Sequence, residues 1–139
     1  MEDVDTYLAL DKSLGENKLY AVSVDRDDAL EELKKAIVYF IIKDGQAVGY
    51  LSYEMKGDSH AYLSGIVIKP EYQGQGLARQ AMEKFLEELK DVKLIDLVTH
   101  PDNVKSISLY ESFGFKKAER YENPFGDGEP RIKMTLDIK

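Results

Sequence analysis

Apolar positions along the chain follow two different periods, and the changes between them divide the chain into elements. In residues 77–89, apolar side chains such as Leu77, Ala81 and Phe85 recur every three to four positions, which predicts a helix with one buried face. Short runs of β-branched and aromatic residues, many alternating with polar ones, predict strands. These runs span residues 37–42, 47–55, 60–68, 94–99, 115–121 and 131–138. Such a succession is typical of an α/β domain.

The N-terminal segment favours a helix before any strand. Val4, Tyr7 and Leu8 share one helical face with Leu14, and Gly15 suits a C-terminal cap. Residues 19–24 then alternate in the manner of a strand. The pattern leaves open whether this segment forms a strand.

The next segments predict a helix and an antiparallel meander. Asp27 and Asp28 precede residues 29–36, which end in lysines and an alanine, so the charges suit the dipole of a helix. Asp44-Gly45 is a turn signal between two strand-like runs, and a second turn follows at residues 57–59. The strand at 60–68 and the strand at 94–99 are joined by a helix and are therefore expected to be parallel. Gly65 within the first of them weakens that strand or marks a bulge.

A glycine-rich loop connects the strand at 60–68 to the helix at 77–89. Residues 73–76 read Gln-Gly-Gln-Gly, so a ligand can approach several backbone N–H groups at the start of the helix closely. Because these groups are free donors with partial positive charge, the expected ligand is a phosphate. A dinucleotide fingerprint would need a small residue where Arg79 stands, and the Gly-Lys-Ser/Thr of a Walker loop is absent. A structural turn that binds nothing is the other interpretation.

Two motifs together favour binding. Residues 73–78, in which Gln73, Gly76 and Ala78 form a Gln-x-x-Gly-x-Ala pattern after Lys-Pro-Glu-Tyr, resemble the acyl-CoA-binding motif of the GNAT superfamily of N-acyltransferases. Residues 103–115, with an Asn, a Leu-Tyr pair seven residues on and then Gly-Phe, resemble the second signature of that superfamily. The resemblance is close from residue 62 to 117 and holds only by pattern elsewhere.

The resemblance implies a fold, a co-substrate and a site. The fold would be a mixed, mostly antiparallel sheet with a central splayed parallel strand pair and flanking helices. Acetyl-CoA would be the acyl donor, with its pyrophosphate on the loop amides and its pantetheine arm along the central strand like an added strand. The residues expected to contact it are Ile66, Val67, Ile68, Gln73, Gly74, Gln75, Gly76, Leu77, Ala78, Arg79 and Asn103.

Tyr110 is the expected catalytic residue. In the superfamily this tyrosine lies near the thioester sulfur, and a tyrosine side chain, with an ordinary pKa near ~10, is a fair proton donor to a departing thiolate. Asn103 and Tyr110 are seven positions apart, about two helical turns, so they are expected on one face. A core tyrosine on an amphipathic helix is the structural alternative.

The general base is not evident. Some members of the superfamily carry Glu or His five residues before the motif asparagine, where this chain has Val98. Polar residues on neighbouring strand positions are the alternatives, together with a bound water. These candidates are Glu54, His60, Tyr62, Ser64, Asp96 and His100. The missing base keeps a second hypothesis open, a catalytically inactive acyl-CoA-binding module.

Composition narrows the classes of partner. The chain of 139 residues, 43% apolar, suits one domain over residues 1–139, and the net charge of −7 disfavours nucleic acid. No cysteine is present, so acyl transfer would go directly from donor to acceptor or use another nucleophile. No run approaches the ~20 apolar residues of a membrane span and no signal peptide is evident, so a cytoplasmic protein is expected. The histidines and carboxylates show no metal-ligand spacing.

The acceptor is expected to be a primary amine, on a protein N-terminus, a lysine or a small molecule. The Phe-Gly-Asp-Gly-Glu stretch at 125–129 resembles, more weakly, the hairpin of protein N-terminal acetyltransferases that holds the acceptor peptide. A solvated acidic turn is an equal alternative. Assembly as a homodimer is left open.

Overall fold

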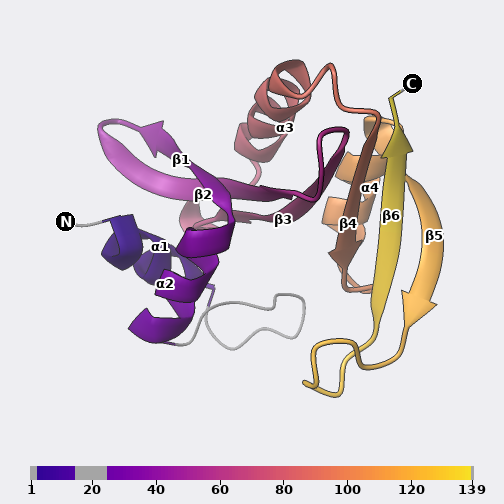
Figure 1. Ribbon diagram of the computed structural model, residues 1–139. Helices are drawn as coiled ribbons and strands as arrows, with labels where there is room; N and C mark the ends of the chain where they lie inside the picture. The colour runs from indigo at the N-terminus through magenta and orange to yellow at the C-terminus, as the bar shows by residue number, and fades with distance from the viewer. Residues whose placement is uncertain (1–2, 15–24, 139) are drawn as a thin grey trace.

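A computed structural model describes residues 3–14 and 25–138, and the predicted cap at Gly15 and strand at 19–24 lie outside these ranges. The described residues form one six-stranded sheet in the order β1-β2-β3-β4-β6-β5, with helices on both faces (Figure 1). No described helix is both long and apolar enough to cross a membrane. The elements are α1 (Asp3–Lys12), α2 (Arg26–Lys35), β1 (Ile37–Lys43), β2 (Gln46–Met55), β3 (His60–Ile68), η1 (Pro70–Tyr72), α3 (Leu77–Glu88), β4 (Leu94–Thr99), α4 (Val104–Ser112), β5 (Lys116–Tyr121) and β6 (Arg131–Asp137).

Local chemistry sets the element boundaries. Helix α2 begins after Asp25, whose side chain accepts a hydrogen bond from the Asp28 N–H at 2.9 Å, and this cap satisfies one of the free donors of the first turn. Asp44 and Gly45 have φ values of 52° and 77°, as a two-residue hairpin turn between β1 and β2 requires. Helix α1 ends at Lys12, so Leu14, which we expected on its apolar face, lies in the turn that follows.

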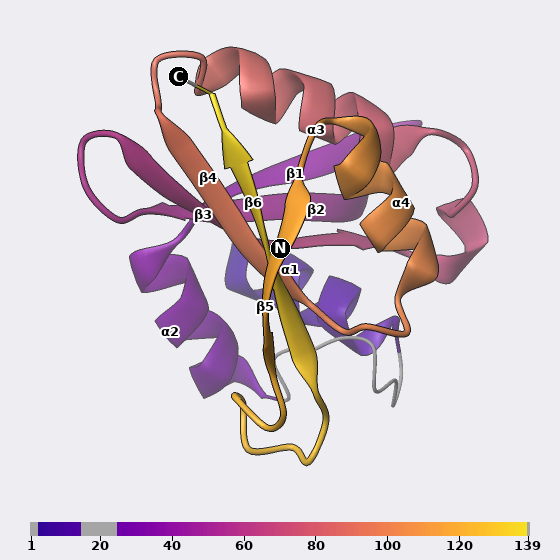
Figure 2. The same cartoon turned by 90° about the vertical axis from the view of Figure 1, so that its right-hand side faces the viewer.

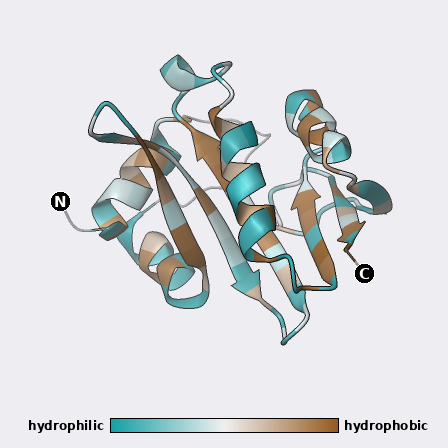
Figure 3. Cartoon of the chain, turned by 90° about the horizontal axis from the view of Figure 1, so that it is seen from above, coloured by the Kyte–Doolittle hydropathy of each residue, from teal (hydrophilic) through white to brown (hydrophobic). Residues whose placement is uncertain are grey.

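Two apolar clusters cover the two faces of the sheet. Helices α3 and α4 pack on one face through side chains such as Phe85 and Ile107, which belong to the same buried cluster as Leu63 and Leu97. Helices α1 and α2 pack on the other face, where Tyr7 stacks on Tyr50 with ring centroids 4.5 Å apart. Figure 2 shows α4 and α2 on opposite sides of β4 and β6. In Figure 3, hydrophobic residues follow the strands, and the outward side of α3 is hydrophilic.

The register explains how the sheet opens at its centre. β3 and β4 pair in parallel from His60–Leu94 to Leu63–Leu97 and no further, although β3 continues to Ile68. One extra residue, Ser64, interrupts the antiparallel pairing of β2 with β3, because Ser52 pairs with Gly65 while Tyr53 pairs with Leu63. Such a bulge increases local twist and redirects the strand. The predicted fold, with a splayed parallel pair inside a mostly antiparallel sheet, is thus confirmed.

Gly49 lies where the backbones of β2 and β3 approach each other closely. A Cβ atom built on Gly49 would lie 2.3 Å from the Val67 carbonyl oxygen, whereas one on Gly65 would meet only the Ser52 Oγ, at 3.9 Å. We expect Gly49→Ala to lower the free energy of unfolding by about 1–3 kcal/mol through steric strain. Gly65→Ala, the control in the neighbouring strand, should change it little. Urea denaturation measures both, and an unaffected Gly49→Ala protein would contradict the steric account.

Candidate active site

A cavity of about 960 Å³ lies between the second half of β3, the loop before α3, and α4. It includes every residue that we expected to contact acetyl-CoA except Val67 and Gln75, and it includes Tyr110. The residues that line it are Leu14, Ile66, Ile68, Pro70, Tyr72, Gln73, Gly74, Gly76, Leu77, Ala78, Arg79, Asp102, Asn103, Val104, Lys105, Ser106, Ser108, Leu109 and Tyr110. Two motifs that are distant in sequence therefore meet at one cavity.

The start of α3 is open and positively polarised. Gly74 and Gly76 have φ values of 81° and 80°, and a Cβ on either would meet nothing within 4 Å. Gly76 is the N-cap, so no side chain caps α3, and no acidic residue lies in its first turn. The first N–H groups of a helix have no intrahelical partner and carry partial positive charge. This end of the cavity suits a phosphate group.

Side chains around the loop hold it in place. The Gln73 amide nitrogen donates to the Ile68 carbonyl at 3.0 Å, so this side chain ties the loop to the end of β3. The Lys43 ammonium donates to the Gln75 side chain, so Gln75 is tied to the β1–β2 hairpin and is absent from the cavity lining. The Arg79 guanidinium lies 5.3 Å from the centre of the Phe113 ring. The loop conformation is therefore fixed by side chains from several elements.

The separated part of β3 forms one wall of the cavity. Ile66 and Ile68 line it, whereas the Val67 side chain is buried in the cluster under α1 and α2. Beyond Leu63, β3 does not pair with β4, so its backbone groups on that edge are unpaired. Because the Val67 side chain points away from the cavity, Val67 can contact a ligand there only through its backbone. An extended arm can add to a strand that lacks a neighbour.

Tyr110 and Asn103 reach the cavity from α4. Tyr110 is 7% exposed and its ring lies 5.9 Å from that of Phe115, centroid to centroid, so the aromatic ring belongs partly to the core. Asn103 is the N-cap of α4, and its side-chain oxygen accepts from the Ser106 N–H at 3.4 Å. Asn103 thus has a structural role that the sequence motif did not indicate.

A His–Asp pair lies on the opposite face of the sheet. The His60 Nε2 and Asp96 Oδ2 atoms are 3.0 Å apart, and the Lys133 ammonium lies 3.8 Å from the same oxygen. His60 is three residues before the last paired residue of β3, or about 10 Å along the strand. His60 is therefore distant from the separated strands. Asp96 lies one residue before the last paired residue of β4, but its carboxylate is held by His60 and Lys133.

The remaining candidate bases are occupied or neutral. The His100 Nδ1 accepts from the Asp102 N–H at 3.0 Å, so its Nε2 carries the proton and donates to Glu129 at 2.7 Å. Burial and the Asp96 and Glu54 carboxylates raise the pKa of Tyr62 to about 12, so its phenol stays protonated at neutral pH. Glu54 pairs with the Lys56 ammonium at 3.2 Å. Ser64 is the one candidate in β3 that lies beyond the last residue paired with β4.

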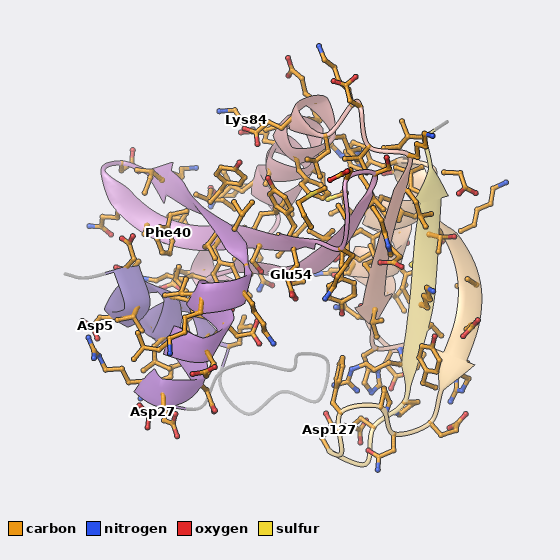
Figure 4. All side chains as sticks on the ribbon, viewed as in Figure 1. Asp5, Asp27, Phe40, Glu54, Lys84 and Asp127 are labelled. Atoms are coloured by element: carbon orange, nitrogen blue, oxygen red, sulfur yellow. The ribbon has the colours of Figure 1, made fainter. Side chains whose placement is uncertain are left out.

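The acidic hairpin between β5 and β6 is held by buried groups. Arg131, 1% exposed, pairs with Asp127 at 2.8 Å, and His100, 2% exposed, pairs with Glu129. Phe125 lies over the Arg131 guanidinium and is half-exposed. Figure 4 shows Asp127 on the hairpin, below the ends of β5 and β6. These acids are therefore structural partners, and sequence alone did not identify Arg131.

Known proteins are similar to this chain in sequence and in architecture. The [ribosomal protein bS18]-alanine N-acetyltransferase of Escherichia coli is 40% identical over 83 residues, 56% of this chain and 56% of that protein. The crystal structure of the E. coli ribosomal-protein-S18-alanine N-acetyltransferase matches with a TM-score of 0.82 and 25% identity, over 100% of this chain and 91% of that one. The chain thus aligns in sequence with about half the length of this curated relative.

Further matches extend the comparison. The catalytic subunit NAA20 of the N-terminal acetyltransferase B complex of Arabidopsis thaliana is 27% identical over 115 residues, 73% of this chain and 66% of that protein. A Salmonella typhimurium structure solved with its cofactor acetyl-CoA matches with a TM-score of 0.73 and 20% identity, over 97% of this chain and 87% of that one. The family model described as Acetyltransferase (GNAT) family matches residues 7–115. The chain therefore belongs to the GNAT acetyltransferase family, whose co-substrate is acetyl-CoA.

Proposed function

We propose that this protein transfers the acetyl group of acetyl-CoA to the N-terminal α-amine of a protein or peptide. One observation carries the choice of acceptor. Among residues 3–14 and 25–138, each carboxylate or imidazole that we considered as the base is paired elsewhere or distant from the place where β3 and β4 separate. An acceptor amine must then arrive already neutral, because only the neutral form has a lone pair for attack.

The supply of neutral amine differs strongly between acceptor classes. An α-amino group has an ordinary pKa of about 7.7–8.0 and a lysine side chain one of about 10.4. Below both values, the neutral fraction of an α-amine exceeds that of a lysine by about 400-fold, as the difference of about 2.6 pKa units requires. A site without a strong base therefore favours N-terminal amines.

The names of the relatives support the same class. One is described as an alanine N-acetyltransferase acting on a ribosomal protein and another as a subunit of an N-terminal acetyltransferase. The sequence matches cover 56% and 66% of those relatives, so their names support a class of acceptor, the N-terminal amine.

The proposed reaction is a direct transfer within a ternary complex. The amine nitrogen attacks the thioester carbon, the C–S bond breaks, and the CoA thiolate leaves. Tyr110, from the α4 side, gives its hydroxyl proton to the sulfur. The acceptor nitrogen loses a proton to water, and solvent returns a proton to the Tyr110 phenolate, so the enzyme is regenerated. A backbone N–H of the separated part of β3 stabilises the oxyanion. The phosphates lie against the start of α3.

The acceptor class is tested with a panel of peptides. Peptides with a free α-amine should be acetylated at least about a hundredfold faster, in kcat/KM at pH 7, than the same peptides blocked at the N-terminus and offering one lysine. The logarithm of kcat/KM should rise with pH up to the pKa of the acceptor amine and then level off. Thiol release measures both. Preference for the lysine peptides, or a rate independent of pH between 6 and 8, would contradict the proposal.

The co-substrate site is tested by thermal shift. Acetyl-CoA at a hundred times its Kd should stabilise the protein by about 2.7 kcal/mol and raise Tm. Gly76→Glu should abolish the shift, since it places bulk and negative charge at the start of α3. Gly126→Glu is the matched control, because Gly126 also has a positive φ, 75°, and open space around it. A shift that survives Gly76→Glu would place the phosphates elsewhere.

Tyr110 is tested by removing its hydroxyl. Tyr110→Phe keeps the ring that packs on Phe115, so the fold and the acetyl-CoA affinity should be retained. Loss of the proton donor should lower kcat by about 10²–10⁴. Steady-state kinetics and a binding titration separate the two effects. An unchanged kcat would assign Tyr110 to the core alone, and a wild-type protein that binds acetyl-CoA yet acetylates no amine would favour an inactive binding module.

A further inference from the structure

His100 is a buried imidazole between the end of β4 and the start of α4. It follows Thr99, the last residue of β4, and is 2% exposed. Its two ring nitrogens have partners in different segments of the chain. Nδ1 accepts a hydrogen bond from the Asp102 N–H at 3.0 Å, and Nε2 donates to a Glu129 carboxylate oxygen at 2.7 Å. One imidazole thereby connects the turn before α4 to the hairpin between β5 and β6.

The Nδ1 contact belongs to the wall of the cavity. Asp102 and Asn103 line the cavity, and so do residues 104–106, which form the first turn of α4. The turn before the helix is tight, since the Asn103 N–H donates to the His100 carbonyl at 3.0 Å. The Asn103 side chain caps α4 through a long contact, 3.4 Å from the Ser106 nitrogen. The imidazole therefore helps to hold the backbone with which this wall begins.

The Nε2 contact holds the hairpin beside the opening between the strands. β3 and β4 separate after Leu97, and β4 continues to Thr99, which pairs with Ile132 of β6. The hairpin joins β6 at Arg131, so its base lies about three residues, or roughly 10 Å, along β4 from the last paired residue. Figure 1 shows the hairpin at the end of the sheet to which the β4 arrow points. An acceptor chain that enters the opening from this end contacts the hairpin.

We infer that His100 is a positioning residue for both substrates, its Nδ1 holding the start of α4 against acetyl-CoA and its Nε2 holding the hairpin for the acceptor. The inference rests on the proposed transfer to a polypeptide amine and names the residue that fixes the two substrate sides relative to each other. His100 touches neither substrate in this role, because both ring nitrogens are used within the chain. It exchanges no proton with them.

Two amide side chains of different length separate the two contacts. In His100→Asn the side-chain oxygen stands near the place of Nδ1 and accepts from the Asp102 N–H, as asparagine does in an Asx turn, but nothing reaches Glu129. In His100→Gln the amide nitrogen stands near the place of Nε2 and donates to Glu129, and the Asp102 N–H loses this acceptor. Each variant thus keeps one contact of the imidazole and removes the other.

The two variants should change different constants. His100→Gln should raise the Kd of acetyl-CoA about two- to tenfold and leave the acceptor KM within about twofold. His100→Asn should leave that Kd within about twofold and raise the acceptor KM about tenfold, because a hydrogen bond to a carboxylate is the stronger one. Calorimetric titration measures the Kd. Steady-state kinetics at saturating acetyl-CoA measure the KM of the best N-terminal peptide of the panel.

Glu129 provides an independent check of the hairpin contact. Its side chain is 32% exposed, so Glu129→Ala should fold, and it should raise the acceptor KM as His100→Asn does. Glu129→Gln keeps an acceptor oxygen and should retain most of the affinity. The effects of His100→Asn and Glu129→Ala should not add, since both remove the same hydrogen bond. His60→Asn is the matched control, because it removes an imidazole–carboxylate contact, to Asp96, in the paired part of the sheet, and it should leave both constants within about twofold.

A histidine that serves only the fold would give a different result. Both His100 variants would then lower Tm and leave Kd and KM unchanged, and this outcome, or an equal change of both constants in the two variants, would overturn the inference. A failure of the proposed function is distinguishable. If the wild-type protein prefers a lysine peptide, the N-terminal acceptor is wrong, and the KM of that peptide should still respond to His100→Asn. A wild-type protein that acetylates no amine would overturn both the proposed function and the role of His100 toward the acceptor.

Discussion

The site depends on the early end of the pairing between β3 and β4. Four parallel residue pairs join these strands, and beyond Leu63 and Leu97 they separate. The bulge at Ser64 turns β3 away, so its last residues pair with β2 on one side only. Those unpaired backbone groups, the open start of α3, and Tyr110 from α4 border the same space. A sheet paired along its whole length would close this space.

Helices α2 and α4 have side-chain caps at their N-termini, whereas α3 has none. α2 and α4 begin with Asp25 and Asn103, whose side chains satisfy free N–H groups, and α3 begins with a glycine that satisfies none. α3 itself is anchored by its apolar face, including Met82 and Phe85, which are almost fully buried. Its stability therefore comes from packing on the sheet, and its first turn is available to a ligand.

The sequence predicted the fold well because its signals are local. Helix α3 follows from apolar spacing, the β1–β2 turn from Asp44-Gly45, and the parallel pair from a helix that connects two strands. The partners of polar residues are not local. His60 and Asp96 are 36 positions apart, and His100 and Glu129 are 29 apart. The sequence pattern placed the candidate bases on or beside strands but contained no information about what lies opposite them, so the choice among them needed the structure.

The hairpin between β5 and β6 is held in one conformation by contacts within the chain. Two almost fully buried cationic or imidazole groups, Arg131 and His100, hold Asp127 and Glu129, and Phe125 covers the Arg131 guanidinium. The conformational entropy of this loop is therefore lost on folding and not on binding of a ligand. A polypeptide that binds against the hairpin loses mainly its own conformational freedom, so even a short and weakly interacting segment could bind there with useful affinity and still leave quickly after modification.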